Sequence, residues 1–468
     1  MELHNEYRVR RGDYMKRVFD KTIFTLEDSS GRLNLFALAM PLFFQQVFSN
    51  LLGTVGAVAL TKVSEDAVTA VNVSNMLINV PTMMTYMITS GTLIILSLSL
   101  GAGEKDTVGR IFVTAVISST ALSLTLSAGM CFFAPSLLTV MNLEGNILDC
   151  GVLYFRIRIL SLALVSLTNC ITAVLRAHGY SKPTMVSGIL TSAVNVAVTV
   201  FVVGKHFDGN KIAGVAVASV LGQLTGFIYA FLSLKIHSDV AQSGRFSTEL
   251  FKRIISVGIP SGMSLFAFSV STVISTSVIA SLGQSSVNIK VYTSNISQYT
   301  YIFGYVLAQS GALMIGRYVG GGNYGKAKQL FRQISYIVPV LNFFAASAVF
   351  FFTAPLMRIF TDDPHLIAVA HTVFLIDIAI EISRGNTHVG ENSLCSVTDT
   401  LFTSIVSILS CIFISALGCW LFSIKLGFGI YGFYIASLLD ETTRGILYRI
   451  RWNKSKWIDG SRITAKQM

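Results

Sequence analysis

The sequence contains few charged residues for its length. They make up 13% of 468 residues, whereas a soluble protein carries roughly 25%. So few charges could not cover a globular surface of this size. The six scattered cysteines argue against a secreted disulfide scaffold, and a hydrophobic content of 52% argues against disorder. The composition therefore indicates an integral membrane protein.

Long apolar segments recur along the chain. A bilayer core requires about 20 apolar residues per helix, and strands of barrel proteins are shorter than these segments. We therefore predict an all-α polytopic protein with twelve transmembrane helices. Their expected ranges are 35–60, 68–99, 110–139, 148–175, 184–204, 212–235, 256–281, 287–316, 329–357, 365–392, 399–423 and 428–448.

Lys and Arg are distributed unevenly between the connecting segments. With the N-terminus in the cytoplasm, 27 of the 35 lie on the cytoplasmic side and 6 on the outer side. This asymmetry follows the positive-inside rule and predicts both termini in the cytoplasm, in the plasma (inner) membrane. It also accounts for the net charge of +11 without nucleic acid as a partner. Segment 1–34 is polar and shows no cleaved signal peptide.

The chain repeats itself at one constant offset. The offset that separates Pro41 from Pro260 also separates the Gly-rich segments beginning at Gly101 and Gly320. Six helices per repeat predict two parallel, pseudo-symmetric six-helix bundles around a central cleft, in a V-shaped arrangement. The expected parts are a cytoplasmic N-terminal tail (1–34), an N-lobe (35–235), a cytoplasmic linker (236–255), a C-lobe (256–448) and a basic cytoplasmic C-terminal tail (449–468).

Several segments resemble signatures of the multidrug and toxic compound extrusion (MATE) family. They include PLFFQQVFSNLLGTV (41–55), SLGAGEKDTVGRIF, RYVGGGNYGKAKQLF, LRAHGYSKP (175–183) and IFTDDPHLI (359–367). LLDETTRGILYRIRWNKSKW (438–457) is similar to the end of a bacterial, mainly Gram-positive, branch. The resemblance implies an antiporter that expels amphipathic, usually cationic, organic compounds and admits H+ or Na+. It further implies no cofactor and a protein that usually works as a monomer.

Mid-span carboxylates are few. Many members of the family have an acidic residue in the first helix, where this chain has Gly53, and segment 256–281 has no carboxylate. Asp377 and Glu381 are four residues apart and Arg384 follows three later, so all three share one helix face. Two carboxylates so close in a low dielectric should not both ionise easily, so one is expected to carry a proton. These residues either couple transport to H+ or Na+, or form salt bridges, Glu381 with Arg384 or Asp377 with Arg158.

Polar side chains on three predicted helices are the expected substrate contacts. The resemblance implies that the second and eighth helices line the cleft. A polar stripe inside a bilayer faces either a wet cavity or a neighbouring helix, so both interpretations stand. The residues concerned are Asn72, Asn75 and Asn79 on the second helix, Asn295, Gln298 and Tyr299 on the eighth, and Gln45, Gln46 and Asn50 on the first.

Asp440, Glu441 and Arg444 lie at the cytoplasmic end of the last predicted helix. They are expected to form structural ion pairs, as is Arg158, with a gate as the alternative. The Gly-rich segments lack the Lys-Ser/Thr ending of a nucleotide-binding loop. No hydrolase motif or metal-ligand spacing appears among the histidines and cysteines, so we expect a transporter and not an enzyme.

Three functions are compatible with these sequence features. The first is a multidrug exporter with H+ or Na+ coupling and rocking-lobe alternating access. The second is a narrow exporter of a metabolite or peptide, or a lipid-linked flippase of the same superfamily. A large anionic substrate would need more basic residues in the spans than Arg156 and Arg158. The third is a sensor built on a degenerate transporter fold.

Overall fold

The computed structural model describes residues 21–28, 31–60, 64–141, 143–204, 209–237 and 244–458. Residues 1–20 of the predicted N-terminal tail, 238–243 of the predicted linker and 459–468 of the predicted C-terminal tail lie outside the described residues.

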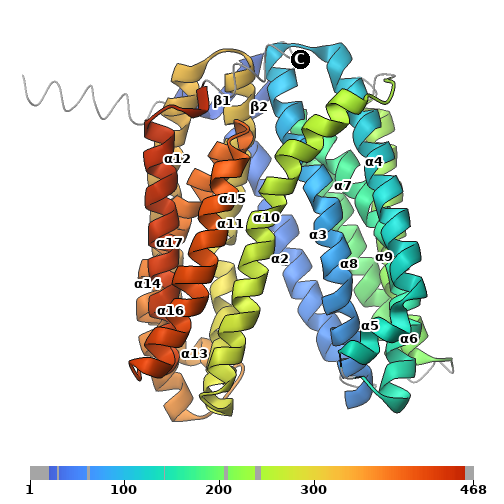
Figure 1. Ribbon diagram of the computed structural model, residues 1–468, viewed down its shortest axis with the longest axis vertical. Coiled ribbons are helices and arrows are strands. Elements are labelled where there is room, and N and C mark those ends of the chain that lie inside the picture. Colours follow the sequence, from blue (N-terminus) through green and yellow to red (C-terminus); the bar gives the residue numbers. More distant parts are fainter. Residues whose placement is uncertain are drawn as a thin grey trace, which may run out of the picture. The chain divides into compact units, whose positions relative to one another are not determined.

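The described chain is built almost entirely of helices (Figure 1). The long helices and helix pairs are α2 (Leu35–Leu60), α3 (Glu65–Ala102), α4 (Lys105–Phe132), α6 (Gly145–Ile159) with α7 (Leu162–Ala177), α8 (Ser181–Val203), α9 (Lys211–Ile236), α10 (Thr248–Ala280), α11 (Gln284–Gly320), α12 (Tyr324–Phe351), α14 (Pro364–Ser396) and α17 (Ile430–Asn453). Between α14 and α17 run α15 (Thr400–Leu409), the π-helix η3 (Ser410–Ala416), α16 (Leu417–Trp420) and the π-helix η4 (Leu421–Lys425). Short helices α5 (Ala134–Val140) and α13 (Thr353–Met357) follow α4 and α12.

Ten of these segments are long and apolar enough to cross a membrane, counted over the described residues. Helices α11 and α17 are also long. Together with the ten segments, these two helices correspond to the twelve predicted spans. Some predicted spans are not single helices: 148–175 is divided between α6 and α7, and 329–357 between α12 and α13. The same is true of segment 110–139. It divides at Phe133 into α4 and α5, where Pro135 occupies the first turn of α5. Proline favours that position because its missing N–H has no intrahelical partner there.

The chain forms two compact units. Unit 1 comprises Met1–Ala39, Ser97–Gly103 and Met263–Met468, and unit 2 comprises Met40–Leu96 and Glu104–Gly262. In unit 2, α8 packs on α9, and α7 packs on α4 and α9. In unit 1, α14 packs against α11, α12 and α17 (Figure 1), so it is the central helix of that unit.

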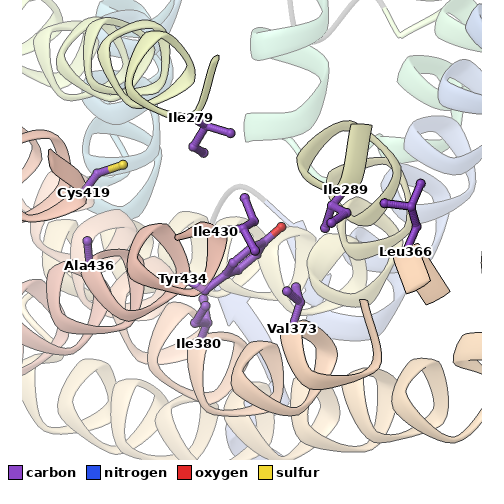
Figure 2. Packing of buried hydrophobic residues seen from close by; sticks show 9 residues of the cluster. All are labelled: Ile279, Ile289, Leu366, Val373, Ile380, Cys419, Ile430, Tyr434 and Ala436. Atoms are coloured by element: carbon purple, nitrogen blue, oxygen red, sulfur yellow. The ribbon is translucent and has the colours of Figure 1, made fainter. Parts of the chain in front are cut away.

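The start of α14 is fixed by its sequence. Asp363 is the N-cap, and its Oδ1 accepts a hydrogen bond from the backbone N–H of His365 at 2.8 Å, while Pro364 takes the first helical position. Both features favour a helix start. Apolar side chains of α14, α11 and α17 then bury one another in the cluster of Figure 2, which contains Val373, Ile380 and Tyr434. This packing holds the polar face of α14 in one orientation.

A β-hairpin precedes the first long helix. Strands β1 (Thr25–Asp28) and β2 (Gly31–Asn34) pair antiparallel, and Asn34 caps α2 by accepting from the N–H groups of Phe36 and Ala37 at 3.1 Å. Ile23, Leu26 and Leu33 are buried. Part of the expected tail is therefore packed structure.

Within unit 1, the end of α3 crosses the end of α11. A Cβ on Gly101 would overlap the carbonyl of Arg317, and a Cβ on Gly320 would overlap the carbonyl of Leu98. The offset of the internal repeat relates Leu98 to Arg317 and Gly101 to Gly320. The two contacts are therefore reciprocal, and each needs a glycine because only glycine lets two backbones approach so closely.

Candidate ion-coupling site

Asp377 and Glu381 are buried in the middle of α14, with 3% and 0% of their surfaces exposed. Their spacing of four residues puts them on one helix face, as the sequence predicts. Ser297 of α11 donates a hydrogen bond to Oδ2 of Asp377 at 2.6 Å. On α12, Asn342 donates to the backbone carbonyl of Glu381 at 3.0 Å. Three helices thus position the two carboxylates.

Arg384 joins α14 to α17. Its guanidinium forms an ion pair with Oε1 of Glu381, one turn away, and its Nε lies 3.3 Å from Oε1 of Glu441. It also lies over the ring of Tyr301 of α11, 5.0 Å from the centroid. The arginine is therefore shared between two carboxylates on different helices.

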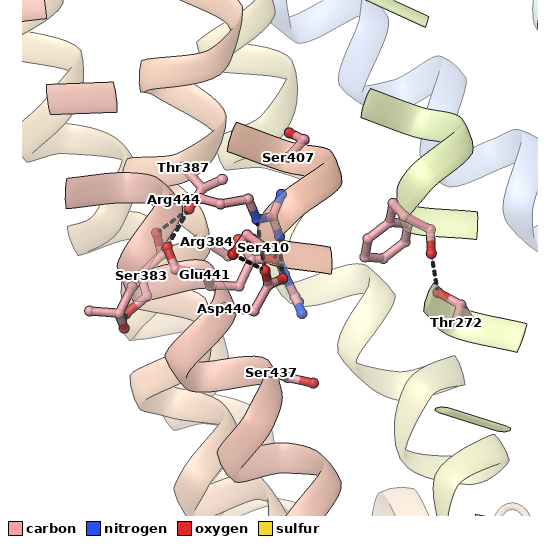
Figure 3. Close-up of polar contacts among 12 residues, drawn as sticks. Thr272, Ser383, Arg384, Thr387, Ser407, Ser410, Ser437, Asp440, Glu441 and Arg444 are labelled. Carbon is pink, nitrogen blue, oxygen red and sulfur yellow. Dashed lines mark hydrogen bonds and ion pairs between the residues drawn. The ribbon is translucent and has the colours of Figure 1, made fainter. Parts of the chain in front are cut away.

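A second arginine continues the network on α17 (Figure 3). Arg444 Nη2 lies 2.7 Å from Oδ2 of Asp440 and 3.2 Å from Oε1 of Glu441. Ser410, the first residue of η3, donates to Oδ1 of Asp440 at 2.5 Å. Asp440, Glu441 and Arg444 thus form a cluster of ion pairs on α17.

The two predicted sets of residues form one network, because Arg384 and Arg444 both contact Oε1 of Glu441. The network holds more carboxylates than guanidiniums, since Glu381, Glu441 and Asp440 face two arginines. Oε2 of Glu381 and Oε2 of Glu441 are buried and accept no hydrogen bond from the part of the chain that the structure describes. Buried, unshared carboxylate oxygens are sites where a proton can bind at low cost.

Two further ionisable residues, which were not predicted from the sequence, lie on the same face of α14. His388 lies against the rings of Tyr305 and Tyr301, with centroids 4.9 and 6.0 Å away. Glu391 lies near Ser264 and Ser407. The signal was present, because positions 377, 381, 384, 388 and 391 alternate steps of four and three, the spacing of one helix face.

Arg158 has a partner in its own unit, where its guanidinium donates to the hydroxyl of Ser161. Within the described residues of unit 2, no carboxylate lies within ion-pair distance of Arg158.

The predicted substrate contacts fall on α2 and α3 of unit 2 and on α11 of unit 1. Some have polar partners: Tyr154 donates to Asn75 at 3.1 Å, Gln46 to Asn50 at 3.3 Å, and Gln298 to the carbonyl of Asn295 at 3.1 Å. Gln45 packs against Gly188. Tyr299 is half-buried, and the side chains of Asn72, Asn79 and Asn295 are exposed.

The described residues contain no group of three or more His, Cys, Asp or Glu side chains placed to hold a metal ion.

The family model described as MatE matches residues 41–201 and 260–421. The chain belongs to the MatE family. The two matched segments begin at Pro41 and Pro260, the same two prolines that the internal repeat relates. Members of this family are membrane transporters of small organic compounds, and not enzymes.

Individual relatives align with most of the chain. It is 28% identical to the uncharacterized transporter YisQ of Bacillus subtilis over 95% of this chain and 99% of that protein. It is 22% identical to a probable multidrug resistance protein NorM of Thermotoga maritima over 91% and 93% of the two chains. It is 21% identical to the multidrug resistance protein PmpM of Pseudomonas aeruginosa over 80% of each.

Solved structures confirm the predicted fold class. A crystal structure of a MATE transporter in the bent conformation superposes with a TM-score of 0.84 at 16% identity, covering 92% of this chain and 96% of the other. A transporter of the MOP superfamily from Pyrococcus furiosus superposes with a TM-score of 0.81 at 16% identity over the same shares. This chain thus has the all-helical membrane fold of MATE transporters.

Proposed function

We propose that this MatE protein is a multidrug exporter that admits protons and expels amphipathic, cationic organic compounds. It acts in the plasma membrane with both termini in the cytoplasm, and alternating access involves lobes 35–235 and 256–448. The observation that carries the proposal is the buried oxygen Oε2 of Glu381, which accepts no hydrogen bond within the described residues. A proton can bind to a lone pair of this oxygen. Asp377 lies one helical turn away and offers a second carboxylate as a proton acceptor.

A proton suits this arrangement better than Na+. The guanidinium of Arg384 contacts Glu381 directly, so a sodium ion bound to that carboxylate would be repelled by the adjacent positive charge. Protonation removes one negative charge from a network that has more carboxylates than arginines. Na+ remains the second candidate, because the carboxylate of Asp377 lies beside the Ser297 hydroxyl and oxygens of both kinds can ligate it.

The substrate class is supported by the relatives named as multidrug resistance proteins and by three exposed amides. Asn72, Asn79 and Asn295 lie on long membrane-crossing helices with exposed side chains. A bare amide facing hydrocarbon is costly, so we assign these side chains to an aqueous substrate path. Few basic residues accompany them, which favours a cation over a large anion.

The test is efflux of an organic cation dye from proteoliposomes under a pH gradient and, separately, a Na+ gradient. Glu381→Gln and Asp377→Asn are compared with wild type. Asp362→Asn removes an exposed carboxylate just before α14 and serves as the matched control. We expect pH-driven efflux in wild type and the control, and its loss in Glu381→Gln.

Each other outcome selects an alternative. Efflux driven only by Na+ would assign the carboxylates to sodium. Full pH-driven efflux in both variants would make Asp377 and Glu381 structural. Absence of efflux under either gradient, with folded wild-type protein, would contradict the multidrug function and favour a narrow exporter, a flippase or a sensor.

A further inference from the structure

Arg384 is the link between the predicted coupling carboxylate and another helix. It pairs with Glu381 on α14. It also pairs with Glu441 on α17, which is far from it along the chain (Figure 3). Oε1 of Glu441 also contacts Arg444 at 3.2 Å. The guanidiniums of Arg384 and Arg444 therefore share one carboxylate oxygen. When one of them binds this oxygen more tightly, the ion pair of the other becomes weaker.

We propose that Arg384 is a positioning residue that transmits the protonation of Glu381 to α17 and to the π-helical segment η3. The proposal rests on the proposed function, because it takes Glu381 as the residue that binds the coupling proton. A proton on Oε2 neutralises Glu381 and removes the charged partner of Arg384 on α14. The guanidinium keeps its charge, and it is attracted more strongly to the charged carboxylate of Glu441 than to a neutral carboxyl group, so it then moves towards Glu441.

The displacement passes from Glu441 to Asp440 through Arg444. As Arg384 takes Oε1 of Glu441, Arg444 is left with Asp440, which it already contacts at 2.7 Å through Oδ2 and at 3.2 Å through Oδ1. Oδ1 is the same oxygen that accepts the hydroxyl of Ser410. A tighter pair between Arg444 and Asp440 therefore weakens the bond that holds η3.

Segment η3 is a suitable end point for this chain of contacts. A π-helix is rare and is frequently found at functional sites, and this one begins at Ser410, the residue that donates to Asp440. Ser410 is followed by Cys411, whose side chain is fully buried. Loosening of η3 would therefore expose a natural thiol.

Several other groups act on Glu381 and set the pH at which the switch responds. Asp377 and Arg384 lie on its own helix, and Glu441 faces it from α17. The Thr300 hydroxyl faces it from α11, and Asn342 of α12 bonds its backbone carbonyl. Tyr301 of α11 is a further titratable neighbour.

The experiment measures the rate of N-ethylmaleimide labelling of Cys411 by mass spectrometry in proteoliposomes. Wild type and Glu381→Gln are compared at each pH between about 8 and about 5. Buried carboxyl groups in proteins can titrate in this range. Because the same thiol is compared at the same pH, its own ionisation cancels. At the highest pH we expect about tenfold faster labelling in Glu381→Gln, since a minor state is populated at about 10% or less. The two rates should converge as wild type becomes protonated.

Three controls make the test decisive. Cys170, which is buried in α7 of unit 2, should be labelled equally in both proteins. Asp362→Asn should behave as wild type. Ser410→Ala removes the bond that holds η3, so Cys411 should be labelled faster than in wild type at the highest pH, and this variant serves as the test if Glu381→Gln does not fold.

Equal labelling of Cys411 in wild type and folded Glu381→Gln at every pH would overturn the proposal, as would wild-type labelling in Ser410→Ala. The efflux assay is a separate readout. Wild-type efflux without a change in labelling would refute the switch alone. A change in labelling without efflux under either gradient would refute the exporter and leave the switch standing.

Discussion

Arg317 and Asp28 form an ion pair between two distant parts of the chain. Nη1 of Arg317 lies 2.9 Å from both carboxylate oxygens of Asp28, and the arginine side chain is completely buried. Burial lowers the pKa of the Arg317 guanidinium, and Asp28 opposes that shift. The pair fastens the N-terminal hairpin to the end of α11, where the backbone of Arg317 also supports Gly101.

We expect Asp28→Asn to lower the free energy of unfolding by about 3 kcal/mol, because it removes the carboxylate partner of a buried charge. Thermal unfolding in detergent would measure this change. Glu27→Gln is the matched control: Glu27 pairs with Arg32 at 71% and 72% side-chain exposure, and such surface pairs contribute about 0–1 kcal/mol. Equal melting temperatures for the two variants would contradict the prediction.

The crossing of α3 and α11 should not tolerate a methyl group. Gly101→Ala and Gly320→Ala should each cost about 1–3 kcal/mol, because each new Cβ overlaps a backbone carbonyl that cannot move as a side chain can. The double variant should cost less than the sum, since both changes separate the same two helices. Gly325→Ala, where nothing lies within 4 Å of the new Cβ, should melt like wild type, and a stable double variant would be inconsistent with this contact.

Stability should fall at alkaline pH through Tyr318. Burial, with a smaller contribution from Asp28, raises the pKa of Tyr318 to about 12, and its hydroxyl donates to the carbonyls of Ile23 and Thr25 at 3.3 and 3.4 Å. Because the folded pKa exceeds the unfolded one, the contribution is fully present below about pH 10 and is lost as pH rises towards about 12. Melting temperatures across this range should fall more steeply in wild type than in Tyr318→Phe, and parallel curves would exclude this role.

The two buried tryptophans should stabilise the end of α17. Trp452 stacks between Phe331 and Trp457, with centroids 4.4 and 4.5 Å away. Trp452→Ala should cost about 3–5 kcal/mol, as expected for removal of a buried aromatic side chain. Trp420, at 40% exposure, provides the control, and Trp420→Ala should cost much less. Similar losses in the two variants would show that the stack contributes little.

Local periodicity predicted a substantial part of the site. The steps of four and three residues that join Asp377, Glu381 and Arg384 are properties of any α-helix. The same holds for Arg444, which reaches Asp440 and Glu441 one turn away. What periodicity could not predict is the partner on another helix, because no sequence spacing relates Glu441 to Arg384.

The sequence by itself determined the membrane class, the twelve spans and the constant offset of the internal repeat, since these depend on composition and on similarity along the chain. It also determined which side chains share a face of α14. Only the tertiary structure decided that Arg384 and Arg444 share Glu441, that Asp28 pairs with Arg317, and that Gly101 and Gly320 lie against opposite helices. Those contacts depend on how helices pack and rotate against one another, which many side chains decide together and no single segment encodes.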